Sequence, residues 1–306
     1  SQIYDFDALL QAHQRAQKKK RDKREIALFE RNREENLINL QNELIWHKWE
    51  PAPPREFLVY EPKQRLIHAP QYCDRVVHHS LCAVIEPLLE RKMVFNSFAC
   101  RKGKGTHRAA NLAQQYSKEL SCRGLVYYLK CDIRKYFSNI DHWILKKILR
   151  RTIRDREALL LIDTIIDADG EGGKGLPIGA LTSQLFANVY LGQLDHLIKD
   201  EMGVKYYTRY MDDFVIFSND KDELRVLLKT IGYWLDRHLK LALNHKTKIL
   251  RASEGLDFCG YRIWAGYRLP RKRNVRRMRK RLRKIVNLYK KQKCTSETIC
   301  QSWQSF

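Results

Sequence analysis

The chain has 306 residues, more than one compact core usually holds, and it carries 58 Lys and Arg against 35 Asp and Glu, a formal charge of +23. That excess argues against a simple metabolic enzyme and favours a polyanionic partner, either nucleic acid or an anionic membrane surface. No apolar run approaches the roughly 20 residues that span a bilayer, and the N-terminus lacks the apolar core of a signal peptide. We therefore expect a soluble, cytoplasmic protein of two or three lobes with no membrane partner.

The eight cysteines include no Cys-x-x-Cys pair, which favours free thiols in a reducing cytosol. Cys73, His78, His79 and Cys82 could suggest zinc, but their spacing is not that of a zinc finger. The surrounding residues 71–92 have the periodicity of an amphipathic helix. We therefore expect no zinc site there.

Residues 3–48 are predicted to form helices, divided by a basic run over 17–24. That run is either a solvated helix surface or a phosphate contact, and the overall charge favours the contact. After a proline-rich break, residues 55–67 predict a β-hairpin that turns near Lys63, with Arg65 beside the tip. Two projecting cations suit a triphosphate, although exposed hairpins also carry Lys and Arg to protect an edge.

Residues 99–105 are a glycine-and-cation loop that leads into another helix. Its Arg101, Lys102 and Lys104, together with backbone amides, could hold a nucleic-acid phosphate. The spacing excludes a Walker phosphate-binding loop. A plain loop before a helix start is an equally good interpretation.

The most strand-like segment, residues 125–133, ends on the carboxylate of Asp132. Asp141 is better explained as the N-cap of a helix that begins at His142. Residues 163–175 are acidic and glycine-rich, which predicts a loop.

A Gly-Pro turn over 175–184 opens a long apolar helix over 185–202. Such a turn packs backbone closely against something, either the core or a bound nucleotide. Further along, the pattern predicts a helix, three short strand segments and a basic helical tail, over 222–239, 241–243, 248–250, 256–264 and 268–293.

Two adjacent carboxylates, Asp212 and Asp213, lie within residues 206–217, where β-favouring residues flank them on both sides. The pattern predicts strand, tight turn and strand, with both carboxylates at the tip. Neighbouring carboxylates repel unless a cation joins them, so the tip suits a hard divalent ion. A polar turn without a ligand is the alternative, because Asp is common in turns.

The order of these elements is the split βαβ pattern of a ferredoxin-like sheet in an α+β protein. It brings Asp132, at the end of one strand, toward the turn of an adjacent hairpin. Three aspartates on a rigid sheet can hold two Mg²⁺ ions roughly 3.5–4 Å apart, the arrangement that phosphoryl transfer uses.

Several motifs resemble those of reverse transcriptases and are ordered along the chain as in that family. Tyr210-Met211-Asp212-Asp213 looks like the signature box of that family, and it follows both the Asp132 strand with Phe137 and a Leu-Pro-x-Gly box over 176–179. The segment over 258–261, Phe-Cys-Gly-Tyr, is similar to the family's primer-gripping hairpin. The similarity extends from Arg55 to Trp264.

The resemblance implies a right-hand polymerase. Its parts would be a basic helical segment over 1–50, fingers over 51–124 with part of 143–182, a ferredoxin-like palm over 125–264 and a helical thumb over 265–306. Relatives usually continue through another helical segment, so the thumb here is either short or truncated.

The resemblance also implies RNA-directed DNA polymerisation from dNTPs, with two Mg²⁺ ions for which Mn²⁺ can substitute. Asp132 and Asp212 would ligate both ions, Asp213 would assist, and the Ile133 carbonyl would complete a shell. Lys246 would donate a proton to the leaving pyrophosphate, with Lys248 as its rival.

The incoming nucleotide would be held by five residues, namely Lys63, Arg65, Phe137, Ile178 and Gly179. Phe137 would be the steric gate against a ribose 2′-hydroxyl. An RNA/DNA duplex would be read by shape and backbone rather than by base edges. The implied contact residues are Arg101, Lys102, Lys104, Gly260, Tyr261, Arg271, Lys272, Arg273, Arg276, Arg277 and Lys280.

Residues 178–184, Ile-Gly-Ala-Leu-Thr-Ser-Gln, with 61–65 and 74–79, are similar to the enzymes of diversity-generating retroelements. Those prokaryotic or phage-encoded enzymes copy a template-repeat RNA, misincorporate opposite adenine and work with a small basic accessory protein assembled as a pentamer. Retron and antiviral-defence reverse transcriptases share the general motifs and stay open as alternatives. A non-catalytic RNA-binding scaffold is a distant alternative, because it predicts a missing carboxylate.

Overall fold

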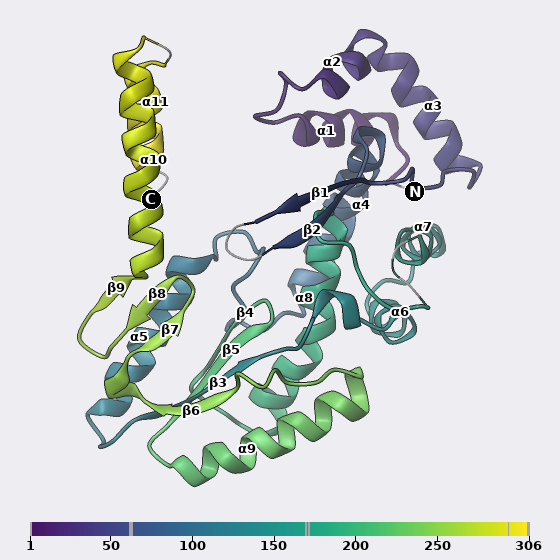
Figure 1. The fold of residues 1–306 in the computed structure, drawn as a ribbon. Helices are drawn as coiled ribbons and strands as arrows, with labels where there is room; N and C mark the ends of the chain where they lie inside the picture. The colour runs from purple at the N-terminus through teal and green to yellow at the C-terminus, as the bar shows by residue number, and fades with distance from the viewer. Residues whose placement is uncertain (1, 61–63, 169, 171, 293, 305–306) are drawn as a thin grey trace.

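Figure 1 shows the computed structural model, in which helices cover both faces of a central sheet and a long helix near the C-terminus stands apart from them. The structure describes residues 2–60, 64–168, 170, 172–292 and 294–304. Helices and strands both build it, as expected for an α+β protein. Within that described part, no helix combines the length and the apolar character needed to cross a bilayer.

The N-terminal layer consists of three helices, as predicted: α1 (Phe6–Ala16), α2 (Arg24–Arg31) and α3 (Arg33–Ile45). They join a fourth helix, α4 (Tyr72–Glu90), because Leu9, Leu37 and Val76 are all buried in one apolar cluster. The predicted hairpin also forms, from β1 (Arg55–Val59) and β2 (Arg65–Ala69). Lys63 lies outside the described residues.

Four strands form the central sheet: β3 (Tyr127–Asp132), β4 (Tyr207–Tyr210), β5 (Asp213–Ser218) and β6 (Lys248–Arg251). Their order is β4-β5-β3-β6, and all three neighbouring pairs are antiparallel. The predicted ferredoxin-like topology is therefore confirmed. Side chains alternate between the two faces of β5, with Phe214 and Ile216 in the larger core and Val215 and Phe217 in the smaller one.

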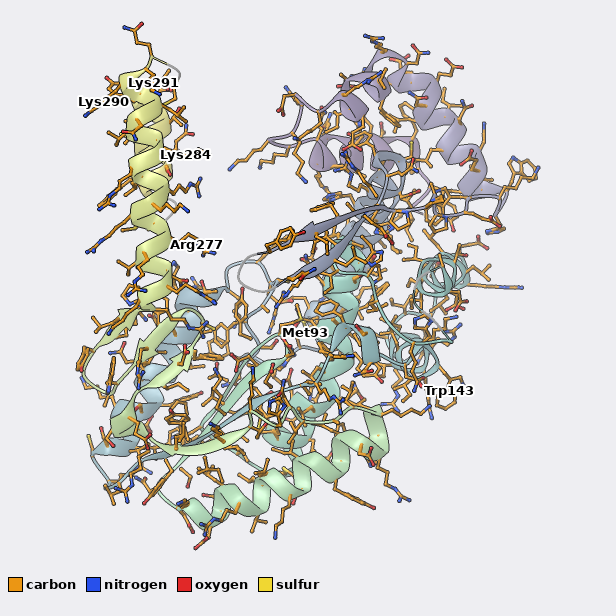
Figure 2. All side chains as sticks on the ribbon, viewed as in Figure 1. Met93, Trp143, Arg277, Lys284, Lys290 and Lys291 are labelled. Carbon is orange, nitrogen blue, oxygen red and sulfur yellow. The ribbon has the colours of Figure 1, made fainter. Side chains whose placement is uncertain are left out.

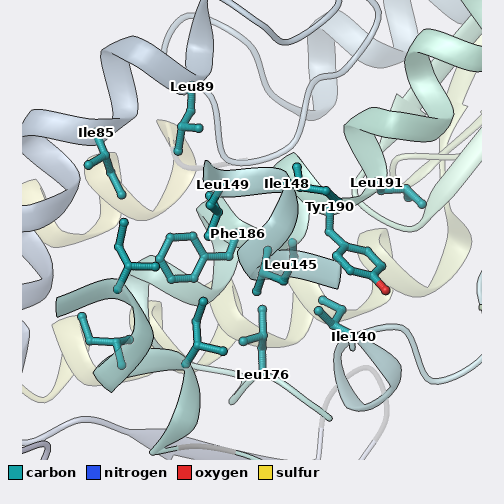
Figure 3. Close-up of a cluster of buried hydrophobic side chains, with 14 of the residues drawn as sticks. Ile85, Leu89, Ile140, Leu145, Ile148, Leu149, Leu176, Phe186, Tyr190 and Leu191 are labelled. Carbon is teal, nitrogen blue, oxygen red and sulfur yellow. The ribbon is translucent and has the colours of Figure 1, made fainter. Parts of the chain in front are cut away.

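Helices α6 (His142–Arg150), α7 (Arg156–Asp167), α8 (Leu181–His196) and α9 (Lys221–Trp234) build the larger core with α4 and the sheet. Figure 3 shows Phe186 and Tyr190 of α8 among Leu145 and Leu149 of α6, with Ile85 of α4 nearby. Helix α8 is apolar all round because it is enclosed on several sides, whereas α6 is amphipathic and keeps an outer face.

The other face of the sheet is covered by α5 (Thr106–Ser121) and by a small antiparallel sheet of β7 (Leu256–Phe258), β8 (Tyr261–Ile263) and β9 (Arg268–Pro270). Two helices end the chain, α10 (Lys272–Lys290) and α11 (Ser296–Gln304), and they pack on each other. Figure 1 shows this pair rising from β9, away from the α1–α3 layer.

Three predicted boundaries are wrong. Helix α7 continues through Asp167 into the predicted loop over 163–175, because Ile165 and Ile166 are buried in the core. The segment 241–243 supplies a single bridge rather than a strand. The basic tail does not become helical at 268, because residues 268–270 pair with β8.

The predicted long helices over 185–202 and 222–239 are confirmed. In each, a π-helical turn, Leu197–Glu201 or Leu235–Leu239, continues the α-helix. Asp141 is the N-cap of α6, as predicted, since its carboxylate accepts a hydrogen bond from the Ile144 amide at 3.1 Å.

Candidate active site

The two adjacent carboxylates lie at the turn between β4 and β5. Tyr210 and Asp213 are register partners, so Met211 and Asp212 form a two-residue turn and Asp213 already begins β5. Met211 has a φ of +57°, a left-handed conformation that a side chain adopts at some cost. The Arg209 Nη1 donates to the Met211 carbonyl at 3.0 Å and supports the turn from behind.

Asp132 faces this hairpin directly, because it is the register partner of Asp213 across β3 and β5. Residues directly opposite on antiparallel strands point to the same face, with Cβ atoms about 4.5–5.5 Å apart. Asn244 holds Asp132 from the other side, where its amide Nδ2 donates to Asp132 Oδ2 at 2.9 Å. The sequence reasoning that brought these carboxylates together is thus supported by the register.

Burial and neighbouring negative charge raise the pKa values of two of these carboxylates, Asp213 and Asp212. Burial is the main cause for Asp213, whose pKa rises to about 7, and the charges of Asp212 and Asp132 raise it further. Burial also raises the pKa of Asp212, while the positive charge of Arg65 lowers it. The hairpin cation therefore acts on this site electrostatically, although it comes from a distant part of the chain.

Lys130 is a neighbour of the site that the sequence reasoning missed. Its Nζ lies 3.3 Å from Asp213 Oδ2 and also donates to the Asp257 carbonyl on β7. The alternation along β3 gave the signal, because residues 130 and 132 of one strand share a face. Lys130 thereby joins the carboxylate site to the β7–β8 hairpin.

The donor set fits a hard cation. Asp213 Oδ1 is buried and has no hydrogen-bond partner among the described residues, which is costly for a carboxylate oxygen. Carboxylate oxygens are the ligands that Mg²⁺ prefers. In the described part of the chain no three acidic, histidine or cysteine side chains are already gathered as ligands of one ion. Lys130 and Asn244 instead hold two of the carboxylates.

A buried ion pair lies behind the β4–β5 hairpin. Arg209 on β4 is fully buried and its Nη2 lies 2.5 Å from Asp195 Oδ2 on α8. Asp195 Oδ1 also accepts hydrogen bonds from Arg209 Nε at 2.7 Å and from the Tyr207 hydroxyl at 2.5 Å. Sequence reasoning missed this pair, although an arginine within an otherwise apolar strand was a signal.

The Leu-Pro-x-Gly box meets the β1–β2 hairpin. The His68 amide donates to the Ile178 carbonyl at 3.0 Å. Gly179 has a φ of +137°, and a Cβ there would lie 2.8 Å from the His68 carbonyl oxygen. The close backbone approach that the Gly-Pro turn predicted is therefore to this hairpin. Phe137 is half-buried, and its carbonyl accepts a hydrogen bond from the Leu176 amide at 2.8 Å.

In the glycine-and-cation loop, the guanidinium of Arg101 is already paired within the protein, contrary to the prediction. Arg101 is not available for phosphate, because its guanidinium pairs with Glu90 and donates to the Val94 and Ser97 carbonyls at 2.6 and 2.7 Å. Lys102 stays exposed at this loop.

Lys104, in the same loop, packs against an aromatic ring. Its Nζ lies 3.6 Å from the Phe95 ring centroid and donates to the Phe95 carbonyl at 2.8 Å. Burial lowers the pKa of Lys104.

The remaining predicted contact residues lie on one side of the molecule. Gly260 forms the β7–β8 turn with a φ of +87°, and the Tyr261 hydroxyl lies 2.8 Å from His107 Nδ1. Arg271 precedes α10, whose 19 residues include no acidic side chain. Figure 2 labels Arg277 and Lys284 on this helix. Lys246 is exposed in the loop before β6, where its amide donates to Asn244 Oδ1 at 3.1 Å.

Comparisons with known proteins agree with this geometry. Protein YkfC of Escherichia coli is 25% identical over 268 residues, covering 73% of this chain and 70% of YkfC. The group II intron-encoded protein LtrA of Lactococcus lactis is 21% identical, covering 83% of this chain and 53% of LtrA. The retron Ec73 reverse transcriptase of Escherichia coli is 30% identical over 115 residues, covering 33% of this chain and 35% of that protein.

Among solved structures, apo telomerase from Candida tropicalis superposes with a TM-score of 0.57 at 12% identity, covering 72% of this chain and 49% of the telomerase chain. The chain thus spans about half the length of that telomerase and of LtrA. The likeness confirms the right-hand polymerase fold. Residues 59–263 match the family model described as reverse transcriptase (RNA-dependent DNA polymerase), and the chain belongs to this family.

Proposed function

We propose that the protein copies an RNA template into DNA from dNTPs. The observation that carries the proposal is the register pairing of Asp132 with Asp213, beside the turn that holds Asp212. These three carboxylates, with the Ile133 carbonyl, would hold two Mg²⁺ ions or their Mn²⁺ substitutes, which neutralise charge on the reacting phosphates.

The chain's own residues would bind and orient the nucleotide. Arg65, within electrostatic range of Asp212, would hold the triphosphate, and Lys63 is proposed to assist it. Phe137 would limit space at the sugar. Ile178 and Gly179 would line the pocket where the box meets β2. Lys246 would donate a proton to pyrophosphate, with Lys248 as the alternative.

The duplex would lie against the basic helix and the β7–β8 hairpin. We propose as contacts Lys102, Lys104, Gly260, Tyr261, Arg271, Lys272, Arg273, Arg276, Arg277 and Lys280. In this arrangement, residues 51–124 with part of 143–182 would be the fingers, 125–264 the palm and 265–306 the thumb. The basic segment over 1–50 would lie outside these three parts.

The finer proposal is the adenine-mutagenic enzyme of a diversity-generating retroelement, with a small basic accessory protein as partner. It rests on the similarity over 178–184, in which this chain has Ile178 where many reverse transcriptases carry a hydrogen-bonding Gln. A branched apolar side chain cannot hydrogen-bond the substrate, so we expect weaker selection of the incoming base. A retron or defence role is the second candidate, which the 30% identity to the retron Ec73 enzyme favours.

Primer extension on an RNA template with Mg²⁺ and dNTPs, followed by cDNA sequencing, tests both levels. We expect product from the native chain and none from the Asp212→Ala, Asp213→Ala double variant. Undiminished synthesis by the double variant would refute the polymerase proposal. Errors concentrated at template adenines, reduced in Ile178→Gln, support the mutagenic role. Uniformly faithful copying would instead favour the retron or defence role.

A further inference from the structure

A groove of about 580 Å³ opens between α6, the end of α8 and the end of α9. Its polar and aromatic lining comes from all three helices: Trp143, Lys147, Arg151, His196, Trp234 and His238. Figure 2 labels Trp143 on the side of the molecule away from α10. None of Asp132, Asp212 and Asp213 and no residue of α10 lines the groove, so it is separate from both the carboxylate site and the basic helix.

The groove presents two flat aromatic surfaces. Trp143 is 67% exposed, which is unusual for so large an apolar ring, and the Lys147 Nζ lies 5.0 Å from its centroid. Trp234 and His238 stack with ring centroids 4.9 Å apart and an interplanar angle of 24°. Aromatic faces beside cations are the surfaces on which single-stranded nucleic acids stack their bases.

The cations of α6 divide into two sets. On the side toward α7, Lys146 pairs with Asp167 and Arg150 pairs with Asp163. Both aspartates belong to α7. On the groove side, Lys147 and Arg151 have no carboxylate within salt-bridge distance among the described residues. Arg151 instead donates to Gln193 Oε1 at 3.1 Å. The groove therefore keeps positive charge that the neighbouring helix does not neutralise.

A histidine and two carboxylates also contribute to the charge at the groove: His196, Asp200 and Glu201. His196 Nδ1 lies 2.6 Å from Asp200 Oδ2, and hydrogen bonds to Asp200 and to the Lys92 carbonyl raise the pKa of His196 against the effect of burial. Glu201 is the acidic residue that lines the groove. With His196 paired to Asp200, the cations of Lys147 and Arg151 face the carboxylate of Glu201, and this excess of positive charge suits a phosphate backbone.

We propose that this groove binds a single-stranded segment of RNA, outside the template–primer duplex, by stacking bases on Trp143 and on the Trp234–His238 pair. Lys147 and Arg151 would contact the phosphates. The inference rests on RNA being the template, as proposed above, but not on catalysis. The aromatic surfaces favour RNA over an acidic peptide, because RNA supplies flat bases to stack on them as well as phosphates for the two cations.

The experiment compares two RNA/DNA duplexes, one blunt and one with a single-stranded RNA extension of about eight nucleotides, a length that one such site can cover. Extensions at the 5′ and at the 3′ end of the RNA are tested separately. We expect one of them to bind the native chain about tenfold more tightly than the blunt duplex, as stacking of one or two bases provides. Trp143→Ala should abolish that gain, and Trp143→Phe should keep most of it.

Trp46→Ala is the matched control, because Trp46 is 70% exposed and lies at the C-terminal end of α3 rather than in the groove. Blunt-duplex affinity and primer extension should be unchanged in all three variants. A gain that survives Trp143→Ala would overturn the proposal. So would competition for the groove by a peptide of aromatic and acidic residues without competition by single-stranded RNA. If the native chain extended no primer but still showed the Trp143-dependent gain in affinity, the polymerase proposal would be refuted and the RNA-binding groove would stand.

Discussion

At the residue scale, the site depends on three carboxylates that the fold holds close together in partly buried positions. Asp213 has both a raised pKa and an oxygen without a hydrogen-bond partner in the described chain. Such an arrangement lowers the stability of the ligand-free fold, and it is found in proteins where a bound ligand compensates the cost. The effects of pH and of metal on stability therefore report directly on the site.

Replacing Asp213 with Asn should stabilise the metal-free protein at pH 8 by about 1–3 kcal/mol. The folded chain binds the Asp213 proton more tightly than the unfolded chain, so ionisation costs stability as the pH rises from about 4, the ordinary pKa, to about 7. The cost is complete above pH 7 and disappears below pH 4. Thermal unfolding in EDTA across this range measures it, with the exposed Asp236→Asn as control. A constant difference at every pH would contradict the assignment.

Lys130→Met should increase the affinity for Mn²⁺ about three- to tenfold, because Lys130 competes with the ion for Asp213 Oδ2 and repels it. Lys130→Arg keeps the charge and should bind Mn²⁺ like the native chain. Electron paramagnetic resonance of free Mn²⁺ gives the dissociation constant without any turnover. If Met and Arg variants bound the ion equally, the competition would not exist.

At the element scale, two contacts between distant segments shape the site. The β4 strand is tied to α8 through Arg209 and Asp195, and the Leu-Pro-x-Gly box is tied to β2 through the His68 backbone. The first contact anchors Arg209, which holds the turn between β4 and β5 through the Met211 carbonyl. The second holds the hairpin that carries Arg65 over the same site.

Asp195→Asn should destabilise the fold by about 3–5 kcal/mol, because it leaves the fully buried Arg209 without a counter-charge. The double variant Asp195→Leu, Arg209→Met should recover much of that loss, since no buried charge remains. Urea denaturation of the three proteins gives the free energies of unfolding. A double variant no more stable than Asp195→Asn would show that the pair acts through something other than charge.

Gly179→Ala should reduce dNTP affinity and stability together, by about 1–3 kcal/mol in stability. The added Cβ would lie 2.8 Å from the His68 carbonyl oxygen and would push β2 away. Gly172 is the matched control, because it also has a positive φ but has no atom within 4 Å of an added Cβ. Gly172→Ala should cost only the backbone term, about 1 kcal/mol. The KM for dNTPs in primer extension reports the effect on nucleotide binding, and thermal unfolding reports the effect on stability, in both variants.

At the scale of the whole molecule, charge is distributed unevenly. The last long helix, α10, carries no acidic side chain and has none of its residues buried. Four of its cations, Arg276, Arg279, Lys280 and Arg283, surround one hollow. The opposite side of the molecule carries the groove at Trp143, with a smaller and mixed set of charges. Electrostatic binding to a duplex should therefore come mainly from α10.

Neutralising three of these cations, as Arg276→Gln, Lys280→Gln and Arg283→Gln together, should weaken duplex binding and lower the slope of log K against log salt concentration by about 2–3. Each phosphate contact releases one bound counterion, so the slope counts contacts. The same change in net charge on α9 and its π-helical turn, with Lys221, Lys229 and Arg237 changed to Gln, should leave the slope nearly unchanged. Equal slopes in the two triple variants would mean that the duplex does not lie on α10.

The sequence by itself determined the strands of the central sheet and most helices, because these follow from local periodicity and from short-range turn chemistry, and the order of these elements along the chain predicted the ferredoxin-like topology. Residues 206–217 predict their hairpin, and Asp141 predicts its helix cap, without reference to the rest of the chain. The motifs likewise point to the family, and all of them lie within residues 59–263, which match its model.

Only the tertiary structure decided which side chains meet across the fold. Arg101 lies in a loop whose composition predicts a phosphate contact, yet its guanidinium forms an ion pair with Glu90 of α4. Lys130, Asp195 and the Trp143 groove have no signature motif, because their partners are separated by many residues along the chain. Local sequence fixes backbone preferences, whereas ion pairs and grooves depend on distances between elements that packing alone sets.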